Sequence, residues 1–412
     1  MSRISRVDGM RKPIDTNVVC LMPWIHMHIW PNGNTFPCCM SDSSDVFGNV
    51  YKENINDLIN NEKFKEMRRQ MLNGEKPKAC TRCYELETSA DSWTLRKNSL
   101  VSFKNHMDLF DKTNEDGSIN DYKMYYMDIR FSNLCNMKCR TCGPELSSSW
   151  YEDQVKMHPD YPKSKFIDLK NNPFFMDDLL PHLNYVEEVY FAGGEALITP
   201  QHYQVLDYWL EKGRTDVRLR YTTNFSALKL KEKSILEYWK MFKDVRVAAS
   251  LDTYGPRAEY SRSGTDWNRI VKNRRQMIES CPDVYFEITP TVSVFSAHSL
   301  FDFHRTWVEE GLLNIDNIRV NILTHPRYFS ITMFTPEQKK EVHEIYDRYL
   351  KWLSDNKAQP HTIHAVKGIV DYMDSANHVD LIPEFKNVIT KIDIIRDESL
   401  LDIFPELKPL WT

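Results

Sequence analysis

Cys135-Asn-Met-Lys-Cys139-Arg-Thr-Cys142 is the stretch from which the fold and function of this chain can be approached. It follows an apolar run, Met124 to Phe131, whose aromatic and β-branched residues predict a strand. Three cysteines spaced C-x3-C-x2-C therefore lie in a loop at the end of a strand. Because the loop is short, their sulfurs stay close together and can converge on one inorganic centre.

Two kinds of centre suit such a loop. Structural zinc usually takes four protein ligands, mostly supplied as C-x2-C pairs. A [4Fe–4S] cluster has four irons, so a loop that gives three thiolates leaves one iron open to a non-protein ligand. The count of three cysteines favours the cluster.

A second motif, Tyr190-Phe-Ala-Gly193-Gly194-Glu195, ends another apolar run. Glycines allow a ligand to approach the backbone closely, and a carboxylate can pair with an ammonium group. Together with the cysteine loop, this Gly-Gly-Glu resembles the signature of the radical S-adenosylmethionine (SAM) superfamily. The resemblance implies that Gly193, Gly194 and Glu195 close the second strand of a barrel and hold the methionine amino group of SAM.

The N-terminal part contains four further cysteines in two pairs. Trp24 to Trp30 predicts a strand and Asn34 to Pro37 a return strand, a hairpin that brings Cys20 and Cys38 toward the same end. Cys80-Thr-Arg-Cys83 supplies the second pair. A four-cysteine set suits zinc and an iron–sulfur cluster about equally.

The order C-x12-G-x4-C followed by C-x2-C resembles the auxiliary-cluster module of many radical SAM enzymes, known as SPASM or, in a shorter form, twitch. That module is C-terminal in the best-known members, whereas here it is N-terminal. The resemblance implies an auxiliary [4Fe–4S] cluster held by Cys20, Cys38, Cys80 and Cys83, and the few cysteines favour the one-cluster twitch form. Cys39 is an alternative to Cys38 as the ligand.

The chain predicts three parts and an α/β fold. Residues 1–116 form a small cysteine-rich α+β module of the SPASM/twitch kind, and Asn114 to Ser118 is the linker that ends it. Residues 117–330 alternate apolar and helical stretches, which argues for a parallel sheet with helical crossovers; the resemblance implies a partial (β/α)6 TIM-like barrel. Residues 331–412 form a C-terminal helical extension. The six predicted strands are Met124–Phe131, Val186–Phe191, Val217–Thr222, Val245–Ser250, Tyr285–Val294 and Asn317–Leu323.

Polar residues follow several of these strands, at the end where α/β barrels carry their working groups. Any one of them can simply cap the next helix. The resemblance implies that Asn224, Ser250 and Arg262 belong to the SAM pocket, with Arg262 reaching the methionine carboxylate. Asp252 is the candidate catalytic residue.

Thr141 departs from the family pattern, because the residue before the last loop cysteine is usually aromatic and lies near the adenine. A different wall for the adenine is therefore expected. Tyr328 and His325, which precede the C-terminal helices, are placed to roof the site.

Composition narrows the setting. The formal charge of −5 over 412 residues does not indicate a nucleic-acid or anionic-membrane surface. The N-terminus lacks an apolar leader, and no apolar stretch is long enough to cross a bilayer. The nine cysteines are clustered, which favours metal binding in a reducing compartment over disulfides. A cytoplasmic protein is expected.

The function implied by the resemblance is reductive cleavage of SAM to a 5′-deoxyadenosyl radical, which abstracts hydrogen from a substrate. Enzymes with an auxiliary cluster often act on a peptide or protein, so oxidation or another modification of such a substrate is expected. The reductant would be a flavodoxin or ferredoxin. Two alternatives stay open: dehydrogenation of a small alcohol or sugar, and a non-catalytic scaffold in which both cysteine sets bind zinc.

Overall fold

The computed structural model describes residues 4–7, 10–88 and 94–411, and the chain divides into two compact units. Unit 1 comprises Met1–Ser132, Ile167–Gly193 and Gln201–Leu219, and unit 2 comprises Asn133–Phe166, Gly194–Pro200 and Arg220–Thr412. This division does not follow the predicted boundaries after residues 116 and 330, which stay predictions.

Unit 1 contains most of a β-sheet in which both directions of pairing occur. β3 (His28–Ile29) pairs antiparallel with β4 (Asn34–Phe36), and β4 pairs antiparallel with β5 (Gly48–Asn49). On its other side β3 runs parallel to β6 (Tyr126–Ile129), and β6 runs parallel to β8 (Glu188–Phe191). The cysteine-rich hairpin thus extends the sheet that begins the predicted barrel, which explains why the contacts do not divide at the predicted linker.

The hairpin prediction is partly wrong. The residues predicted as a strand from Trp24 begin instead with the short helix α1 (Met22–Ile25), and only His28–Ile29 pairs as a strand. Pro23 lies in the first turn of α1, where proline fixes a helical φ and needs no N–H partner. The return strand is confirmed as β4.

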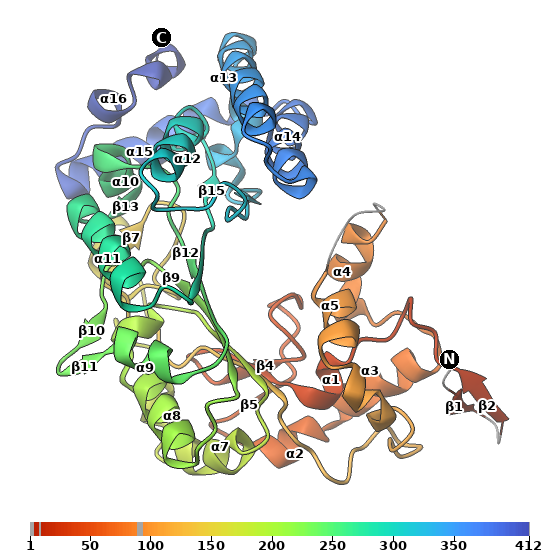
Figure 1. Ribbon diagram of the computed structural model, residues 1–412. Coiled ribbons are helices and arrows are strands. Elements are labelled where there is room, and N and C mark those ends of the chain that lie inside the picture. The colour runs from red at the N-terminus through yellow and green to blue at the C-terminus, as the bar shows by residue number, and fades with distance from the viewer. Residues whose placement is uncertain (1–3, 8–9, 89–93, 412) are drawn as a thin grey trace. The chain divides into compact units, whose positions relative to one another are not determined.

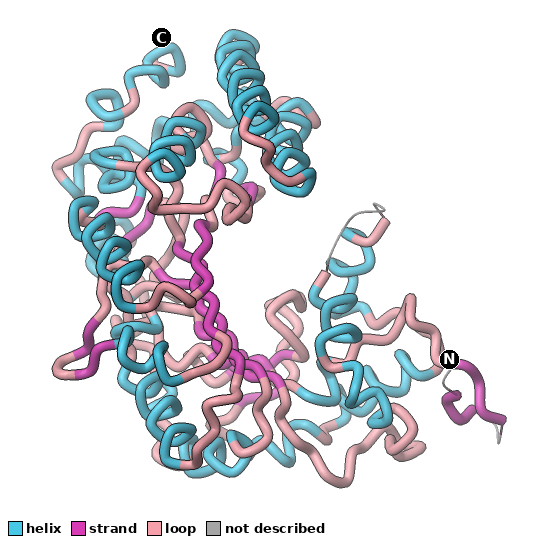
Figure 2. Tube along the Cα trace, viewed as in Figure 1, coloured by secondary structure: helices cyan, strands magenta, loops and turns pink. Residues whose placement is uncertain are grey.

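The remaining elements of unit 1 are a two-stranded hairpin and a set of helices (Figures 1 and 2). They are β1 (Ile4–Val7), β2 (Met10–Pro13), α2 (Ile55–Ile59), α3 (Glu62–Leu72), the 3₁₀ helix η1 (Lys78–Cys80), α4 (Thr81–Leu86), α5 (Leu95–Ser102), the 3₁₀ helices η2 (Lys104–Leu109) and η4 (Leu169–Asn171), α7 (Phe175–Leu183) and α8 (Pro200–Glu211). The buried face of α3 includes Arg68, which is fully buried and donates to the carbonyl oxygens of Gly117, Pro23 and Ile59.

Unit 2 continues the α/β pattern. β9 (Arg218–Thr223) spans the division between the units, and in unit 2 β12 (Val245–Ala249) pairs parallel with β14 (Tyr285–Ile288). β15 (Thr291–Val292) pairs parallel with β16 (Asn321–Ile322). The other strands and α-helices of the unit up to residue 330 are β7 (Lys138–Cys139), α6 (Tyr151–Met157), β10 (Lys229–Leu230), β11 (Lys233–Ser234), α9 (Ile235–Met241), α10 (Gly255–Ser261), β13 (Arg262–Ser263), α11 (Trp267–Ser280) and α12 (Leu300–Glu309).

The C-terminal part of unit 2 is helical, with α13 (Pro336–Asp355), α14 (Pro360–Asp374), α15 (Ile382–Arg396) and α16 (Leu400–Ile403). α13 begins at a capping box in which Thr335 and Gln338 satisfy each other's backbone N–H groups. Its buried stripe includes Val342, Tyr346 and Tyr349. The class is therefore α/β with a mostly parallel sheet, and the partial barrel stays a proposal.

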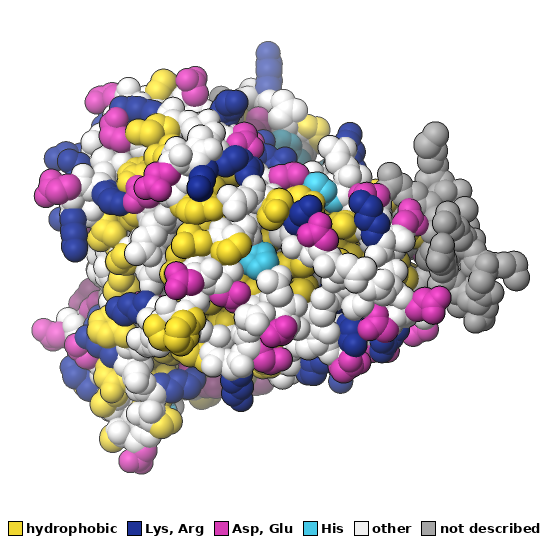
Figure 3. Space-filling view, turned by 90° about the horizontal axis from the view of Figure 1, so that it is seen from below, with side chains coloured by type: hydrophobic (Ala, Val, Ile, Leu, Met, Phe, Trp, Pro, Cys, Tyr) yellow, Lys and Arg dark blue, Asp and Glu magenta, His cyan; other side chains and the backbone are white. Residues whose placement is uncertain are grey.

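The described surface is mixed in charge. On the face shown in Figure 3, basic and acidic side chains are interspersed among apolar and neutral ones. None of the helices in the described ranges has both the length and the apolar character required to cross a membrane.

Candidate functional site

The cysteine loop of unit 2 is held by hydrogen bonds from the segment that follows it. The Cys135 N–H donates to Ser148 Oγ at 3.2 Å, and the Cys135 carbonyl oxygen accepts from Ser149 Oγ at 2.7 Å. Trp150 Nε1 donates to the Cys139 carbonyl oxygen at 2.8 Å. These bonds fix the backbone at two of the three cysteines. The sequence analysis missed this segment, although its run of three serines before a tryptophan is visible in the sequence.

The three thiols of the loop are free. Burial, and after it the nearby Cys139 thiol, raises the pKa of the Cys135 and Cys142 thiols to about 12. Iron and zinc bind the thiolate form of cysteine. Burial disfavours this negatively charged form, and a bound metal cation would stabilise it. The donor set therefore fits a metal centre or cluster bound by three thiolates.

Two polar side chains contact the sulfurs. Arg262 Nη1 lies 3.7 Å from Cys139 Sγ, and Asn224 Nδ2 lies 3.9 Å from Cys135 Sγ. Arg262 is placed beside the loop because β13 pairs antiparallel with β7, with Arg262 opposite Cys139. Hydrogen bonds to the sulfurs are among the features that set the potential of an iron–sulfur cluster. The structure thus brings two of the predicted SAM-pocket residues to the cysteines.

Asp252 lies in the same cluster of side chains. Its two carboxylate oxygens accept from Arg262 Nε and Nη2 at 2.8 and 2.9 Å, and Oδ1 also accepts from the Thr291 N–H at 2.7 Å. The bidentate pair fixes the plane of the guanidinium group. Asp252 therefore orients Arg262, and its predicted catalytic role stays a prediction.

Glu195 is buried and fully engaged by protein donors. Oε1 accepts from the Leu197 N–H at 3.0 Å and from Thr223 Oγ1 at 2.7 Å, and Oε2 accepts from the Asn224 N–H at 2.6 Å. Burial raises the pKa of this carboxyl group, and these hydrogen bonds act in the opposite direction. Glu195 thus ties its own turn to the end of β9.

The two glycines before Glu195 both have a positive φ, +82° at Gly193 and +51° at Gly194. In unit 1, a Cβ atom at Gly193 would lie only 2.5 Å from Cδ of Arg130. Side chains are disfavoured at both positions, which agrees with the predicted need for a bare backbone.

Ser250 directly follows β12, and its N–H donates to the Thr223 carbonyl oxygen at 2.8 Å.

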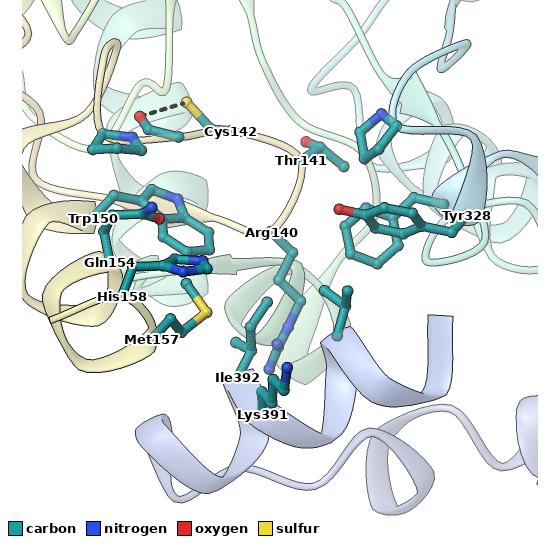
Figure 4. Close-up of a pocket in the computed structure, with 15 residues that line it drawn as sticks. Arg140, Thr141, Cys142, Trp150, Gln154, Met157, His158, Tyr328, Lys391 and Ile392 are labelled. Atoms are coloured by element: carbon teal, nitrogen blue, oxygen red, sulfur yellow. Dashed lines mark hydrogen bonds between the residues drawn. The ribbon is translucent and has the colours of Figure 1, made fainter. Parts of the chain in front are cut away.

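A cavity of about 350 Å³ lies beside the cysteine loop and is lined by Thr141 and Cys142 (Figure 4). Its lining also includes the aromatic side chains of Trp150, Tyr328 and Phe329. An aromatic surface is therefore present near the position where the family pattern is broken.

The four N-terminal cysteines lie in unit 1. The pKa of Cys38 is raised well above its ordinary value, first by burial, then by the adjacent Cys39 thiol and by the thiols of Cys20 and Cys80; Cys80 in turn interacts with Cys20 and Cys83. Cys39 differs, because the charged groups acting on its thiol are Asp128 and Arg130. The electrostatic interaction of Cys38 with Cys20 and Cys80 favours Cys38 over Cys39 as the fourth member of the set.

A buried cluster of His26, His28 and Asp128 brings three potential ligand atoms within 4.8 Å of one another. Trp30 Nε1 donates to His28 Nε2 at 2.9 Å, and an indole can only donate, so Nε2 is unprotonated. The proton then lies on Nδ1, which donates to the Asp128 carbonyl oxygen at 2.9 Å. Arg130 Nε pairs with the Asp128 carboxylate at 3.0 Å. These contacts favour a hydrogen-bonded core cluster over a metal site.

Residues 20–84 match the family model SPASM, described as an iron–sulfur cluster-binding domain. The match confirms the predicted N-terminal module of this kind, and its range contains Cys20, Cys38, Cys80 and Cys83. No curated protein matches the sequence.

Among solved structures, the chain is similar to native anSMEcpe with bound AdoMet and the Cp18Cys peptide, at 13% identity and a TM-score of 0.35, over 57% of this chain and 61% of that one. It is also similar to Streptococcus suis SuiB bound to the precursor peptide SuiA, at 15% identity and a TM-score of 0.36, over 73% and 62% of the two chains. The chain thus spans less than two thirds of the length of either protein. Likenesses at this level carry no argument about function.

Proposed function

We propose that this chain is a radical SAM enzyme in which Cys135, Cys139 and Cys142 hold a [4Fe–4S] cluster with one open iron. The observation that carries the proposal is the presence of three free thiols in one loop of eight residues, with Asn224 and Arg262 directed at two of the sulfurs. When bound, such a cluster supplies the reductive cleavage of SAM to a 5′-deoxyadenosyl radical. The protein's own part is to bind and orient SAM and the substrate, and to shield the site from water.

SAM is assigned to the residues around the loop, namely Gly193, Gly194, Glu195, Asn224, Ser250 and Arg262. Both oxygens of Glu195 already accept from protein donors, so this carboxylate serves to shape the turn. The methionine ammonium group is then assigned to backbone oxygens of the Gly-Gly-Glu turn, and the methionine carboxylate to Arg262. The adenine is assigned to the cavity beside Thr141, where Tyr328 and Phe329 offer the aromatic surface that residue 141 lacks.

Cys20, Cys38, Cys80 and Cys83 are proposed to hold an auxiliary [4Fe–4S] cluster. The SPASM match over residues 20–84 and the mutual proximity of these thiols support it. The substrate is proposed to be a peptide or protein that is oxidised or otherwise modified, as the resemblance implies. A flavodoxin or ferredoxin in the cytoplasm would be the electron donor.

Anaerobic purification tests the proposal. The expected result is a brown protein that contains iron and sulfide and that, once reduced, forms 5′-deoxyadenosine from SAM. A colourless protein that contains only zinc and does not bind SAM would contradict it and favour the scaffold alternative. Deuterated peptide pools would then identify the substrate class, because label from the reacting carbon enters 5′-deoxyadenosine.

A further inference from the structure

Arg140, which stands between the second and third cysteines of the loop, is anchored in the C-terminal helices. Its side chain is fully buried, and Nη2 donates to Asp393 Oδ1 at 2.7 Å and to the carboxylate of Glu398. The guanidinium group lies 3.6 Å from the centre of the Tyr260 ring, and Nε donates to the Tyr260 carbonyl oxygen at 3.2 Å. The loop is therefore tied to residues about 250 positions further along the chain.

A second arginine also connects the C-terminal extension to the cysteine loop, but this arginine belongs to the extension. Arg396, in the last turn of α15, donates from Nε to Asp153 Oδ2 at 2.8 Å. Asp153 also pairs through Oδ1 with Lys138 of the loop at 3.0 Å. The Arg396 guanidinium lies 4.6 Å from the centre of the Trp150 ring, and Trp150 holds the Cys139 carbonyl oxygen.

Ser263 joins the two connections. Its hydroxyl donates to Glu398 Oε1 at 2.8 Å and accepts from Arg396 Nη1 at 3.0 Å. Its backbone lies opposite Lys138 in the β7–β13 pair. The network contains three cations and three anions, so its formal charges balance: Lys138, Arg140, Arg396, Asp153, Asp393 and Glu398.

A cluster held by three cysteines makes one protein bond fewer than a closed four-cysteine site, so its loop must be ordered by other contacts. The backbone bonds from residues 148–150 fix Cys135 and Cys139. Arg140 lies between Cys139 and Cys142, and its side chain is bonded to Asp393 of α15 and to Glu398, which follows that helix. The contacts of Arg140 thus fix the part of the loop between Cys139 and Cys142.

We propose that residues 382–398 form a latch that positions the cysteine loop through Arg140 and Arg396. The inference rests on the proposed function, since it assigns the loop a cluster, and it adds a role for the C-terminal extension. Arg140 and Arg396 act as positioning residues. Without the latch the three thiols remain, but the loop no longer holds them in the geometry that retains iron and leaves one iron open to SAM.

The decisive comparison is Arg140→Met against Arg257→Met in the full chain with both clusters reconstituted. Arg257 is a matched control, because Nη2 donates to Glu406 of the C-terminal segment at 2.9 Å and the group lies 4.9 Å from the centre of the Phe404 ring. In the described part of the chain, Arg257 pairs with Glu406 and forms no hydrogen bond or ion pair with residues 135–142, whereas Arg140 belongs to that loop.

Two measurements are made: the rate of iron release to a chelator, and the electron paramagnetic resonance (EPR) spectrum of the reduced protein with and without SAM. In Arg140→Met, about half of the iron is expected to leave at least tenfold faster than in the parent, and the spectral change on adding SAM is expected to be lost. Arg140→Lys keeps the charge but not the forked geometry, and an intermediate release rate is expected. Arg257→Met should match the parent in both measurements.

The inference is overturned if Arg140→Met releases iron and responds to SAM as Arg257→Met does. If Arg140→Met does not fold, as judged by circular dichroism, Arg140→Lys and Asp393→Asn take its place under the same criteria. If the parent itself shows no response to SAM, the proposed function fails, and alkylation of Cys142 in the metal-free chain decides the latch separately. At least tenfold faster alkylation in Arg140→Met than in Arg257→Met supports the latch, and equal rates refute it.

Discussion

The two cysteine sets of this chain differ in how their thiols are positioned. The set in unit 1 draws four thiols from separate short segments; Cys38 and Cys80 are acted on by other thiols of the set, and Cys20 Sγ also lies 3.5 Å from Ser99 Oγ. The set in unit 2 draws three thiols from eight consecutive residues, and its surroundings supply side chains directed at the sulfurs and the backbone. The first set can close around its metal with protein sulfur alone, whereas the second needs help from outside the loop.

This difference follows from the number of ligands. Four thiolates complete the protein ligation of a [4Fe–4S] cluster, while three leave one iron for a small molecule. An open position is useful only if the remaining ligands are held firmly, and the hydrogen bonds around residues 135–142 do this. The comparison predicts that damage to the loop affects SAM chemistry, and that damage to the four-cysteine set affects iron content and turnover.

Cys139→Ala should have the largest effect. Two thiolates cannot securely hold a cluster with an open iron, so formation of 5′-deoxyadenosine from SAM by the reduced protein should fall to background while the fold persists. Cys281→Ala is the control, because Cys281 Sγ donates to the Leu236 carbonyl oxygen at 3.3 Å and lies outside both sets. Product formation at the parent rate in Cys139→Ala would show that this loop is not the site.

Replacing Cys80 and Cys83 together by alanine should remove about half of the iron, since each set is proposed to hold one four-iron cluster. SAM binding and slow SAM cleavage should survive, because the three loop thiols are unchanged, whereas substrate turnover should stop. Cysteine-rich modules often depend on metal for their stability, so circular dichroism must accompany the iron measurement. Iron content equal to that of the parent would mean that this set holds zinc or no metal.

The features that the sequence predicted well are local. The predicted strand Val217–Thr222 is observed as Arg218–Thr223, and Val245–Ser250 as Val245–Ala249, because a buried strand is recognised from its own apolar run. The N-terminal module was recognised from its resemblance to SPASM and twitch modules, since the four cysteines alone suited zinc equally, and the SPASM match confirms that resemblance. The ligand and SAM-pocket residues stay predictions.

The features that the sequence did not reveal depend on long-range packing. Arg140 and Asp393 are 253 positions apart, and nothing in the sequence near either residue indicates that they meet. Asn224 was recognised as a polar residue after a strand, but neither Asn224 nor Thr223 was expected to be a partner of Glu195. The strand expected from Trp24 was wrong because the effect of Pro23 on the following turn outweighed the apolar pattern.

Gly194→Val should weaken SAM binding without loss of iron. Gly194 has a φ of +51°, which a β-branched residue rarely adopts, and the side chain would also fill the space assigned to the methionine ammonium group. We expect the dissociation constant of SAM, measured by calorimetry, to rise at least tenfold, equivalent to about 1.4 kcal/mol.

Gly213→Val is the control for Gly194→Val, since Gly213 has a φ of +68° and a Cβ there would meet no atom within 4 Å. It reports the cost of backbone strain away from the loop. Unchanged SAM affinity in Gly194→Val would remove the Gly-Gly-Glu turn from the SAM site.

The smallest effect is expected for Cys39→Ala. This substitution tests whether Cys38 or Cys39 is the fourth ligand of the set in unit 1. Cys38 interacts with the adjacent Cys39 and also with Cys20 and Cys80, while the charged groups around the Cys39 thiol are Asp128 and Arg130. Cys39→Ala should therefore keep the full iron content and the parent EPR spectrum, with a change in unfolding free energy of about 1 kcal/mol or less from the lost thiol contact. Cys38→Ala should lose about half of the iron, since a four-iron cluster would miss one of its ligands. If Cys39→Ala lost the iron and Cys38→Ala kept it, the fourth ligand would be Cys39, and the backbone of this turn would have to rearrange when the cluster binds.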